Sequence, residues 1–223
     1  MYCHKLTNFD IPGIGHIVIN ELPAPSEFPH LVACKHTLSA EPVKLRQVHG
    51  GDAHYIGTHN DVERTRFSRG DALVTSVPEI PIAVVTADCI PVILAHRSAA
   101  AVVHCSWRSI AAGVVENTLD LLKESAGIPL NELHCVMGPG ILGDEYEVGA
   151  EVAEHFPQSI SELPSGKFLL DLPAEVAIRL KIAGVLSQNV AVPLASTFKE
   201  RWLPSYRREG NSVGRMTTAV WLE

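Results

Sequence analysis

The segment from Asp71 to His104 constrains the fold more than any other part of this 223-residue chain. β-Branched residues gathered in short runs predict strands, and the run that follows Cys89 and the run that ends at His104 are expected to be neighbours. We therefore expect strands to crowd the centre of the chain. The runs, separated by breaks with Pro, Asp or Ser, are DALVTS, IAVVTA, PVILA and AAAVVH.

The flanking sequence adds strands before this segment and helices mainly after it. Helices are predicted over Ile110–Glu124, Glu147–Phe156 and Asp171–Ala183, the last with Asp171 at its start and Gly184 as its stop. Strands that crowd the middle and helices that come later favour an α+β fold with mixed sheets over regular βαβ alternation. With no internal repeat or linker, residues 1–223 are expected to form a single domain. The further predicted strands are GHIVIN, VKLRQVH, LHCVMG and RMTTAVWLE.

Composition excludes several classes of protein. A hydrophobic content of 46% indicates a compact chain with a substantial core. The net charge of −7 argues against nucleic acid and anionic membranes as partners, although a local basic pocket for an anionic small molecule stays open. No apolar run has the length of a membrane span, and MYCHKLTNFDIPGIG lacks the apolar core of a signal peptide. The expected compartment is the cytoplasm.

The cysteines form an odd and scattered set without a CxxC pair, so in a reducing compartment they are free thiols, metal ligands or a nucleophile. Cys34 and Cys135 are expected to be small buried hydrophobic residues. The full set is Cys3, Cys34, Cys89, Cys105 and Cys135.

Three residues that can bind a metal ion as soft or borderline ligands are predicted at strand ends. His49 ends a predicted strand before Gly50-Gly51, His104 ends another, and Cys89 lies in the break between two more. If they converge at one sheet edge, a His₂Cys set has the ligand number of a catalytic zinc with an open position, and copper is the alternative by ligand softness. Ordinary packed residues explain the same spacing, and on composition and spacing alone they are the favoured interpretation.

Several motifs, in the same order along the chain, resemble the YfiH/laccase-domain family from about Leu45 to the C-terminus. That family was long labelled polyphenol oxidase and was later described as purine nucleoside phosphorylases. TADC followed by HxxWR is the most specific part of the pattern. The matching segments are RQVHG, DALVTSVPEIPIAVVTADCIPVILA, VVHCSWRSIAAGVVENTL, GPGILGDEYEVGAEV and SYRREGNSVGRMTTAVWL.

The resemblance implies a zinc site and assigns catalytic residues. The histidine of the family's QVHG element corresponds to His49, the cysteine of TADC to Cys89 and the histidine of HAGWRG to His104. In the family these three residues bind zinc. The arginine of the last element corresponds to Arg108, which could point a guanidinium at an anion over the metal. The family's fold is a compact α/β sandwich with mixed sheets.

The resemblance also implies a substrate pocket and a reaction. Tyr206, Arg207 and Arg208 correspond to the family's SYRR element and Arg215 to its GR pair, so these residues are expected to face a nucleoside and phosphate. The implied reaction is phosphorolysis of adenosine, inosine, guanosine or methylthioadenosine, with adenosine deaminase activity alongside. Some members are instead tied to editing of peptidoglycan precursors.

The chain departs from the family pattern around the ligands. HAGWRG becomes HCSWRS, which places Cys105, Ser106 and Ser109 where small residues are usual. Leu142 replaces a glycine, acids stand at Asp144 and Glu145, and Ser196 replaces a cysteine. We expect the metal ligands to be preserved and the pocket walls to differ.

Two other classes of function remain open from the sequence. A metal-free cysteine hydrolase would use Cys89 as nucleophile, His104 as base and His49 as orienter, on a peptidoglycan precursor or another small substrate. A catalytically silent binding protein is the second. Asp88 could orient a histidine or merely cap a turn. A copper polyphenol oxidase is not expected, because reduction of oxygen by four electrons needs several coppers and this chain has no HxH pair.

Overall fold

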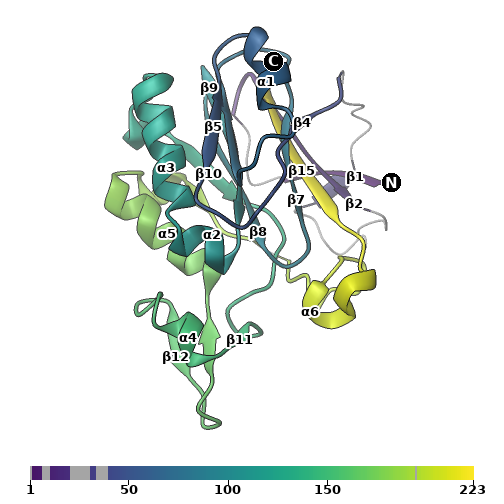
Figure 1. Ribbon diagram of the computed structural model, residues 1–223, viewed down its shortest axis with the longest axis vertical. Helices are drawn as coiled ribbons and strands as arrows, with labels where there is room; N and C mark the ends of the chain where they lie inside the picture. The colour runs from purple at the N-terminus through teal and green to yellow at the C-terminus, as the bar shows by residue number, and fades with distance from the viewer. Residues whose placement is uncertain (1, 7–10, 21–30, 34–39, 194) are drawn as a thin grey trace.

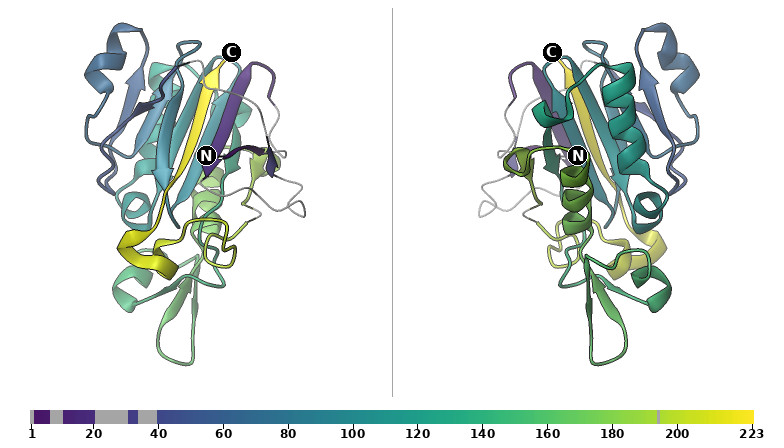
Figure 2. Two further views of the ribbon diagram at one scale, coloured as in Figure 1. Left: turned by 90° about the vertical axis from the view of Figure 1, so that its right-hand side faces the viewer. Right: turned by 90° about the vertical axis from the view of Figure 1, so that its left-hand side faces the viewer.

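The computed structural model describes residues 2–6, 11–20, 31–33, 40–193 and 195–223. Two six-stranded sheets stack face to face, and helices cover the outer face of the second sheet (Figure 1). A three-stranded sheet projects from one end of this body, the end at which α6 also lies (Figure 2). The predicted α+β class with mixed sheets is confirmed.

The strands are ordered as follows. The first sheet has the order β3 (Leu31–Ala33), β1 (Tyr2–Leu6), β2 (Ile14–Asn20), β15 (Met216–Leu222), β7 (Ile82–Thr86) and β4 (Val43–Lys44). The second has the order β14 (Val190–Ala191), β10 (His134–Met137), β8 (Ile90–His96), β9 (Ala99–Cys105), β6 (Ala72–Thr75) and β5 (Ala53–Ile56). The small sheet has the order β11 (Glu147–Val148), β13 (Phe168–Leu170) and β12 (Ile160–Glu162).

The helices are short except for α5. They are α1 (Asn60–Thr65), α2 (Trp107–Ala111), α3 (Val114–Asp120), α4 (Ala150–Ala153), α5 (Leu172–Ala183) and α6 (Tyr206–Glu209). A π-helical turn and three 3₁₀ turns complete the structure: η1 (Leu121–Ser125), η2 (Leu130–Glu132), η3 (Ser187–Asn189) and η4 (Gly210–Ser212). No helix in the described residues is long and apolar enough to cross a membrane.

The second sheet is buried on both faces, which explains why its strands are continuous apolar runs and do not alternate with polar residues. On β8, Val92 and Leu94 pack against the helices, whereas Ile93 packs against the first sheet. On β9, Val103 and Val102 divide between the two sides in the same way. Packing on both faces therefore fixes the strand ends of this sheet relative to one another.

Three predicted elements differ in the structure. The strand predicted from VKLRQVH ends at Lys44, and after one bridge between Arg46 and Arg69 the chain enters a turn that carries His49. The helix predicted over Ile110–Glu124 begins earlier, at Trp107, and is interrupted at Gly113, whose φ of 84° lies in the left-handed region and ends α2.

The helix predicted over Glu147–Phe156 is also shorter. Glu147–Val148 pairs with β13 as strand β11, and only Ala150–Ala153 is helical, because the backbone hydrogen bonds of the first two residues go to the small sheet. The helix predicted over Asp171–Ala183 is confirmed as α5. The Asp171 side chain accepts from the Ala174 amide, and Gly184 ends the helix with a φ of 101°.

Candidate active site

The register of the second sheet brings Cys89 and His104 together. In the β8–β9 ladder, Pro91 lies opposite His104, so Cys89, two residues earlier on the same face, is its diagonal neighbour. In the β6–β9 ladder, Ala72 lies opposite Val103, which places Asp71 beside His104. All three side chains face the first sheet, because successive strand residues alternate between faces.

Asp71 joins this strand edge to the turn that carries His49. Its side chain is fully buried and accepts from the backbone amides of Val48 at 3.1 Å, His49 at 3.0 Å and Gly50 at 2.8 Å. Nδ1 of His104 lies 2.7 Å from the same carboxylate. His49 has a φ of 57°, a left-handed conformation that a non-glycine residue adopts only when its surroundings impose it. The Asp71 bonds supply that constraint.

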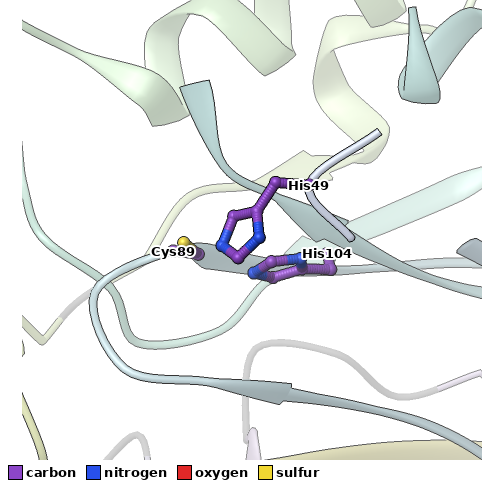
Figure 3. A group of neighbouring side chains, drawn as sticks. All are labelled: His49, Cys89 and His104. Atoms are coloured by element: carbon purple, nitrogen blue, oxygen red, sulfur yellow. The ribbon is translucent and has the colours of Figure 1, made fainter. Parts of the chain in front are cut away.

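His49, Cys89 and His104 converge as the sequence predicted (Figure 3). Their ligand atoms lie within 4.8 Å of one another, and the two imidazole rings meet edge to face with centroids 4.9 Å apart. Asp71 engages Nδ1 of His104, which leaves Nε2 for a ligand. Among the described residues this is the one group of three His, Cys, Asp or Glu side chains placed to hold a metal ion. Two imidazoles and a thiolate fit zinc, and a carboxylate behind a histidine is a common arrangement at zinc sites.

Hydrogen bonds shift the ionisation of these groups. Burial raises the pKa of the Cys89 thiol, but hydrogen bonds and charge from His104 and His49 outweigh it and lower the pKa to about 7. Burial lowers the pKa of His104, and the bonds to Asp71 and Cys89 outweigh it and raise the pKa to about 9. Burial raises the pKa of Asp71, but the bonds from His104 and the loop amides outweigh it and lower the pKa. Near neutral pH the site favours a thiolate beside an imidazolium.

Two adjoining hollows open at this cluster, with volumes of about 240 Å³ and about 590 Å³. Both are lined by His49, Ala87, Cys89, Arg108 and Tyr206. The smaller hollow has an aromatic wall and adds Asp88, Ser106, Trp107, Ile141, Tyr146, Leu172 and Arg207. The larger adds Leu45, Gln47, Val85, His104 and Arg215.

Three of the four predicted arginines line the hollows. Arg108 lies at both, and its guanidinium stacks over the Trp107 ring at 4.2 Å from the centroid. Arg207 lines the smaller hollow, 5.0 Å over the Tyr146 ring, and Arg215 lines the larger. Neither Arg108 nor Arg207 forms an ion pair with a carboxylate in the part of the chain that the structure describes.

Arg208 lies elsewhere. Its guanidinium donates to the backbone carbonyls of Thr197, Phe198 and Leu203 and pairs with Glu209, and it is not among the residues that line either hollow. These bonds hold the segment before α6 in place, so the structure does not bring Arg208 together with the other predicted pocket residues.

Asp88 holds α6 against the His49–Cys89–His104 cluster. One carboxylate oxygen accepts from the Thr197 hydroxyl at 2.6 Å and the other from the Arg207 amide at 2.6 Å, so the side chain contacts neither histidine. Its φ of 85° turns the chain sharply just before Cys89. Asp88 is thus neither a histidine orienter nor a simple strand cap, and it links Cys89 to Arg207.

The departures at Ser106 and Ser109 form a closed polar group. Each serine hydroxyl accepts from the other's backbone amide, at 3.0 and 2.8 Å, which is a capping box at the start of α2. The Ser109 hydroxyl also donates to the His104 carbonyl at 2.7 Å. Ser109 is fully buried, so its hydroxyl needs hydrogen-bond partners, and these bonds supply them. The glycine that is usual at this position has no hydroxyl to satisfy. The departure is accommodated without disturbing His104.

Sequence reasoning missed two residues of the site. One is Asp71, and an acid directly before a fully apolar run is the signal in the sequence that could have found it. Tyr146 lies in the GDEYEVG segment and lines the smaller hollow. Burial and then the charge of Cys89 raise the pKa of its hydroxyl to about 12, so it stays neutral and able to donate. Of the predicted buried cysteines, Cys135 is buried, and Cys34 lies outside the described residues.

Comparison with known proteins identifies the group to which the chain is related. Residues 29–223 match the family described as multi-copper polyphenol oxidoreductase laccase. The chain belongs to this YfiH/laccase-domain family. A purine nucleoside phosphorylase of Pseudomonas aeruginosa is 34% identical over 196 residues, which cover 83% of this chain and 76% of that protein. The purine nucleoside phosphorylase YfiH of Escherichia coli K12 is 34% identical over 193 residues, covering 83% and 75%.

Solved structures agree with this membership. A crystal structure of a Neisseria meningitidis protein matches with a TM-score of 0.77 at 26% identity, covering 100% of this chain and 98% of its own. The YfiH protein of Bacillus licheniformis matches with a TM-score of 0.76 at 25% identity, covering 81% and 74%. The YfiH/laccase-domain fold is therefore shared across the described parts of the chain.

Asp71→Asn should weaken zinc binding by about 10- to 100-fold, the usual effect of losing a group that orients a metal-binding histidine. An amide cannot accept all four bonds that the Asp71 carboxylate accepts, and its NH₂ group would face other donors. Titration against a chromophoric chelator measures the affinity. Asp52→Asn, an exposed acid on the same loop, is the matched control. An unchanged affinity in folded Asp71→Asn would contradict the role given to Asp71.

In zinc-free protein, alkylation of Cys89 by iodoacetamide should reach half its maximal rate near pH 7. A lowered thiol pKa means that the reactive thiolate forms at lower pH than for an ordinary cysteine, whose pKa is about 8.5. Mass spectrometry of peptides after labelling at each pH identifies the modified cysteine. Cys105 and Cys135 serve as internal controls, because burial raises the pKa of both thiols. A midpoint for Cys89 at pH 8.5 or above would refute the proposed stabilisation of its thiolate.

Proposed function

We propose that this chain is a zinc-dependent purine nucleoside phosphorylase acting on adenosine, inosine, guanosine or methylthioadenosine, with accompanying adenosine deaminase activity. The observation that carries the proposal is the His49–Cys89–His104 cluster at the junction of two hollows lined by guanidinium groups. The purine nucleoside phosphorylase names of relatives in Pseudomonas and Escherichia support the choice of substrate.

The residues around the cluster suit an anion beside a nucleoside. Phosphorolysis forms a bond from a phosphate oxygen to C1′ of the ribose and breaks the bond from C1′ to the purine nitrogen, which leaves with the electron pair. Arg108 and Arg207 can hold phosphate by charge-assisted hydrogen bonds. Asp88 is the one carboxylate among the residues that line the hollows, and its oxygens are occupied by Thr197 and Arg207. No free carboxylate at the walls opposes the anion.

The hollows also have room for the nucleoside. The larger volume, about 590 Å³, falls in the range of small-molecule sites. Trp107, Tyr146 and Tyr206 supply aromatic surface around the cluster for a planar base. When held by His49, Cys89 and His104, zinc would supply Lewis-acid stabilisation of developing negative charge. The neutral Tyr146 hydroxyl can donate a hydrogen bond to the substrate.

A second candidate, a metal-free cysteine hydrolase, is favoured by one observation. Cys89 has a thiol pKa of about 7 and two imidazoles beside it, the arrangement of an activated nucleophile. In that scheme His104 takes the thiol proton and His49 orients the group. Zinc and nucleophilic use of Cys89 exclude each other at one time, so metal dependence separates the two candidates. Polyphenol oxidation is disfavoured, because one three-ligand site cannot store four electrons.

Zinc-loaded protein should release the purine base and a sugar 1-phosphate from the four nucleosides only when phosphate is present: ribose 1-phosphate from adenosine, inosine and guanosine, and 5-methylthioribose 1-phosphate from methylthioadenosine. Incubation of the panel with and without phosphate, followed by chromatography, measures this activity, and formation of inosine from adenosine reports deamination. Cys89→Ala should lose both zinc and activity while keeping its melting temperature, because the core does not depend on an ion at a strand edge. Wild-type protein without zinc after metal-replete expression, shown by elemental analysis, would favour the cysteine hydrolase. Absence of turnover on every nucleoside would favour a binding protein.

Arg108→Ala should lower kcat/KM for phosphorolysis by about 10-fold to more than 100-fold, because a charge-assisted hydrogen bond contributes about 1.5–3 kcal/mol. Arg108→Lys should recover only part of the loss, since a point charge does not reproduce the guanidinium fork. Zinc content should not change in either variant. If Arg108 only packs on Trp107, Arg108→Ala will lower the melting temperature and leave the phosphate KM and kcat normal.

A further inference from the structure

A buried carboxylate outside the hollows connects two segments of their walls. The Glu145 side chain is 5% exposed, and one of its oxygens accepts from the Ser196 hydroxyl. Its other oxygen lies 2.7 Å from Nζ of Lys199. Lys199 also lies 2.7 Å from Asp144, whose side chain is 66% exposed. We call Glu145, Ser196 and Lys199 the Glu145 clamp.

Because the Glu145 carboxylate is buried, its stability depends on the groups that bind it. A buried carboxylate is costly unless a cation and hydrogen-bond donors compensate it, so Glu145 holds its segment against Ser196 and Lys199. The Ser196 hydroxyl in turn accepts from the amides of Phe198 and Lys199, each at 3.2 Å. These two bonds order residues 196–199 independently of the bond to Glu145.

The clamp is next in sequence to one wall of the smaller hollow and is linked through Thr197 to another. Tyr146 follows Glu145, and its ring lines that hollow beneath the Arg207 guanidinium. Thr197 follows Ser196, and its hydroxyl donates to Asp88, the neighbour of Cys89. Glu145 itself lines neither hollow. The clamp therefore joins the wall that carries Tyr146 to the wall that carries Cys89.

We propose that Glu145 is a positioning residue that sets the place of Tyr146, and through it the shape of the smaller hollow and the affinity for the nucleoside. This inference rests on the proposed nucleoside phosphorylase function. A shifted Tyr146 ring changes the surface that meets the substrate and leaves the metal ligands in place. Nucleoside binding, and not zinc binding, is the property that depends on the clamp.

Glu145→Ala should raise the nucleoside KM by about tenfold, the scale of one charge-assisted hydrogen bond, with kcat changed by less than about threefold. Zinc content should equal that of the wild type. Asp144→Asn is the matched control, because the neighbouring carboxylate is exposed and its loss should leave KM unchanged. Lys199→Met should lower the melting temperature more than Glu145→Gln does, because it leaves a buried carboxylate without a cation.

A double-mutant cycle separates positioning from a general loss of stability. If Glu145 acts through Tyr146, Glu145→Ala should raise KM no further in a Tyr146→Ala background. A full further rise there, or a wild-type KM in folded Glu145→Ala, overturns the inference. If Glu145→Ala does not fold, Glu145→Gln decides, since it loses the ion pair and an unchanged KM would overturn the inference. Failure of the wild type to turn over any nucleoside overturns the proposed function as well, whereas an active wild type with an unaffected Glu145 variant overturns the inference alone.

Discussion

The buried carboxylate of Asp71 is the interaction on which the arrangement of the site depends. It belongs to the second sheet, and its partners are a histidine on the neighbouring strand and three backbone amides of the turn that follows β4. A buried charge with every acceptor position used is stable, whereas the same charge with partners removed is costly. His49 is exposed and in a left-handed conformation, and Asp71 accepts from its backbone amide. The two histidines reach the same point because one carboxylate holds both.

The walls of the hollows follow a related principle, in which polar groups hold one another while Arg108 and Arg207 have no carboxylate partner in the described residues. Asp88 binds Thr197 and the Arg207 amide, which leaves the Arg207 guanidinium over Tyr146. Stacking on Trp107 places Arg108 at both hollows without a carboxylate partner. In a chain with a net charge of −7, these guanidinium groups form a local positive region suited to phosphate.

Two pairs of positions at which this chain departs from the family pattern lie close to the ligands and the walls, and one of them, Ser106, lines the smaller hollow. Ser106 and Ser109 form a capping box that also supports the His104 carbonyl. Glu145 and Ser196 bond to each other. Both departures are hydrogen-bonded pairs, which explains why they fit a buried environment. They leave the His₂Cys cluster intact, so any difference in chemistry from other family members is expected in the choice of substrate.

Local patterns in the sequence were sufficient for the class of fold, for most strands of the two large sheets and for helix α5, because apolar runs and caps act over neighbouring residues. The selection of His49, Cys89 and His104 came from the family motifs and not from these local patterns. They failed where distant partners decide: Glu147–Val148 became a strand because β13 takes its hydrogen bonds, and His49 lies in a turn because Asp71 binds that backbone. The diagonal placement of Cys89 beside His104, the use of Arg208 to hold backbone carbonyls and the place of Tyr146 in the wall are likewise tertiary results. Register and buried hydrogen bonds join residues far apart in the chain, and no local pattern encodes those pairings.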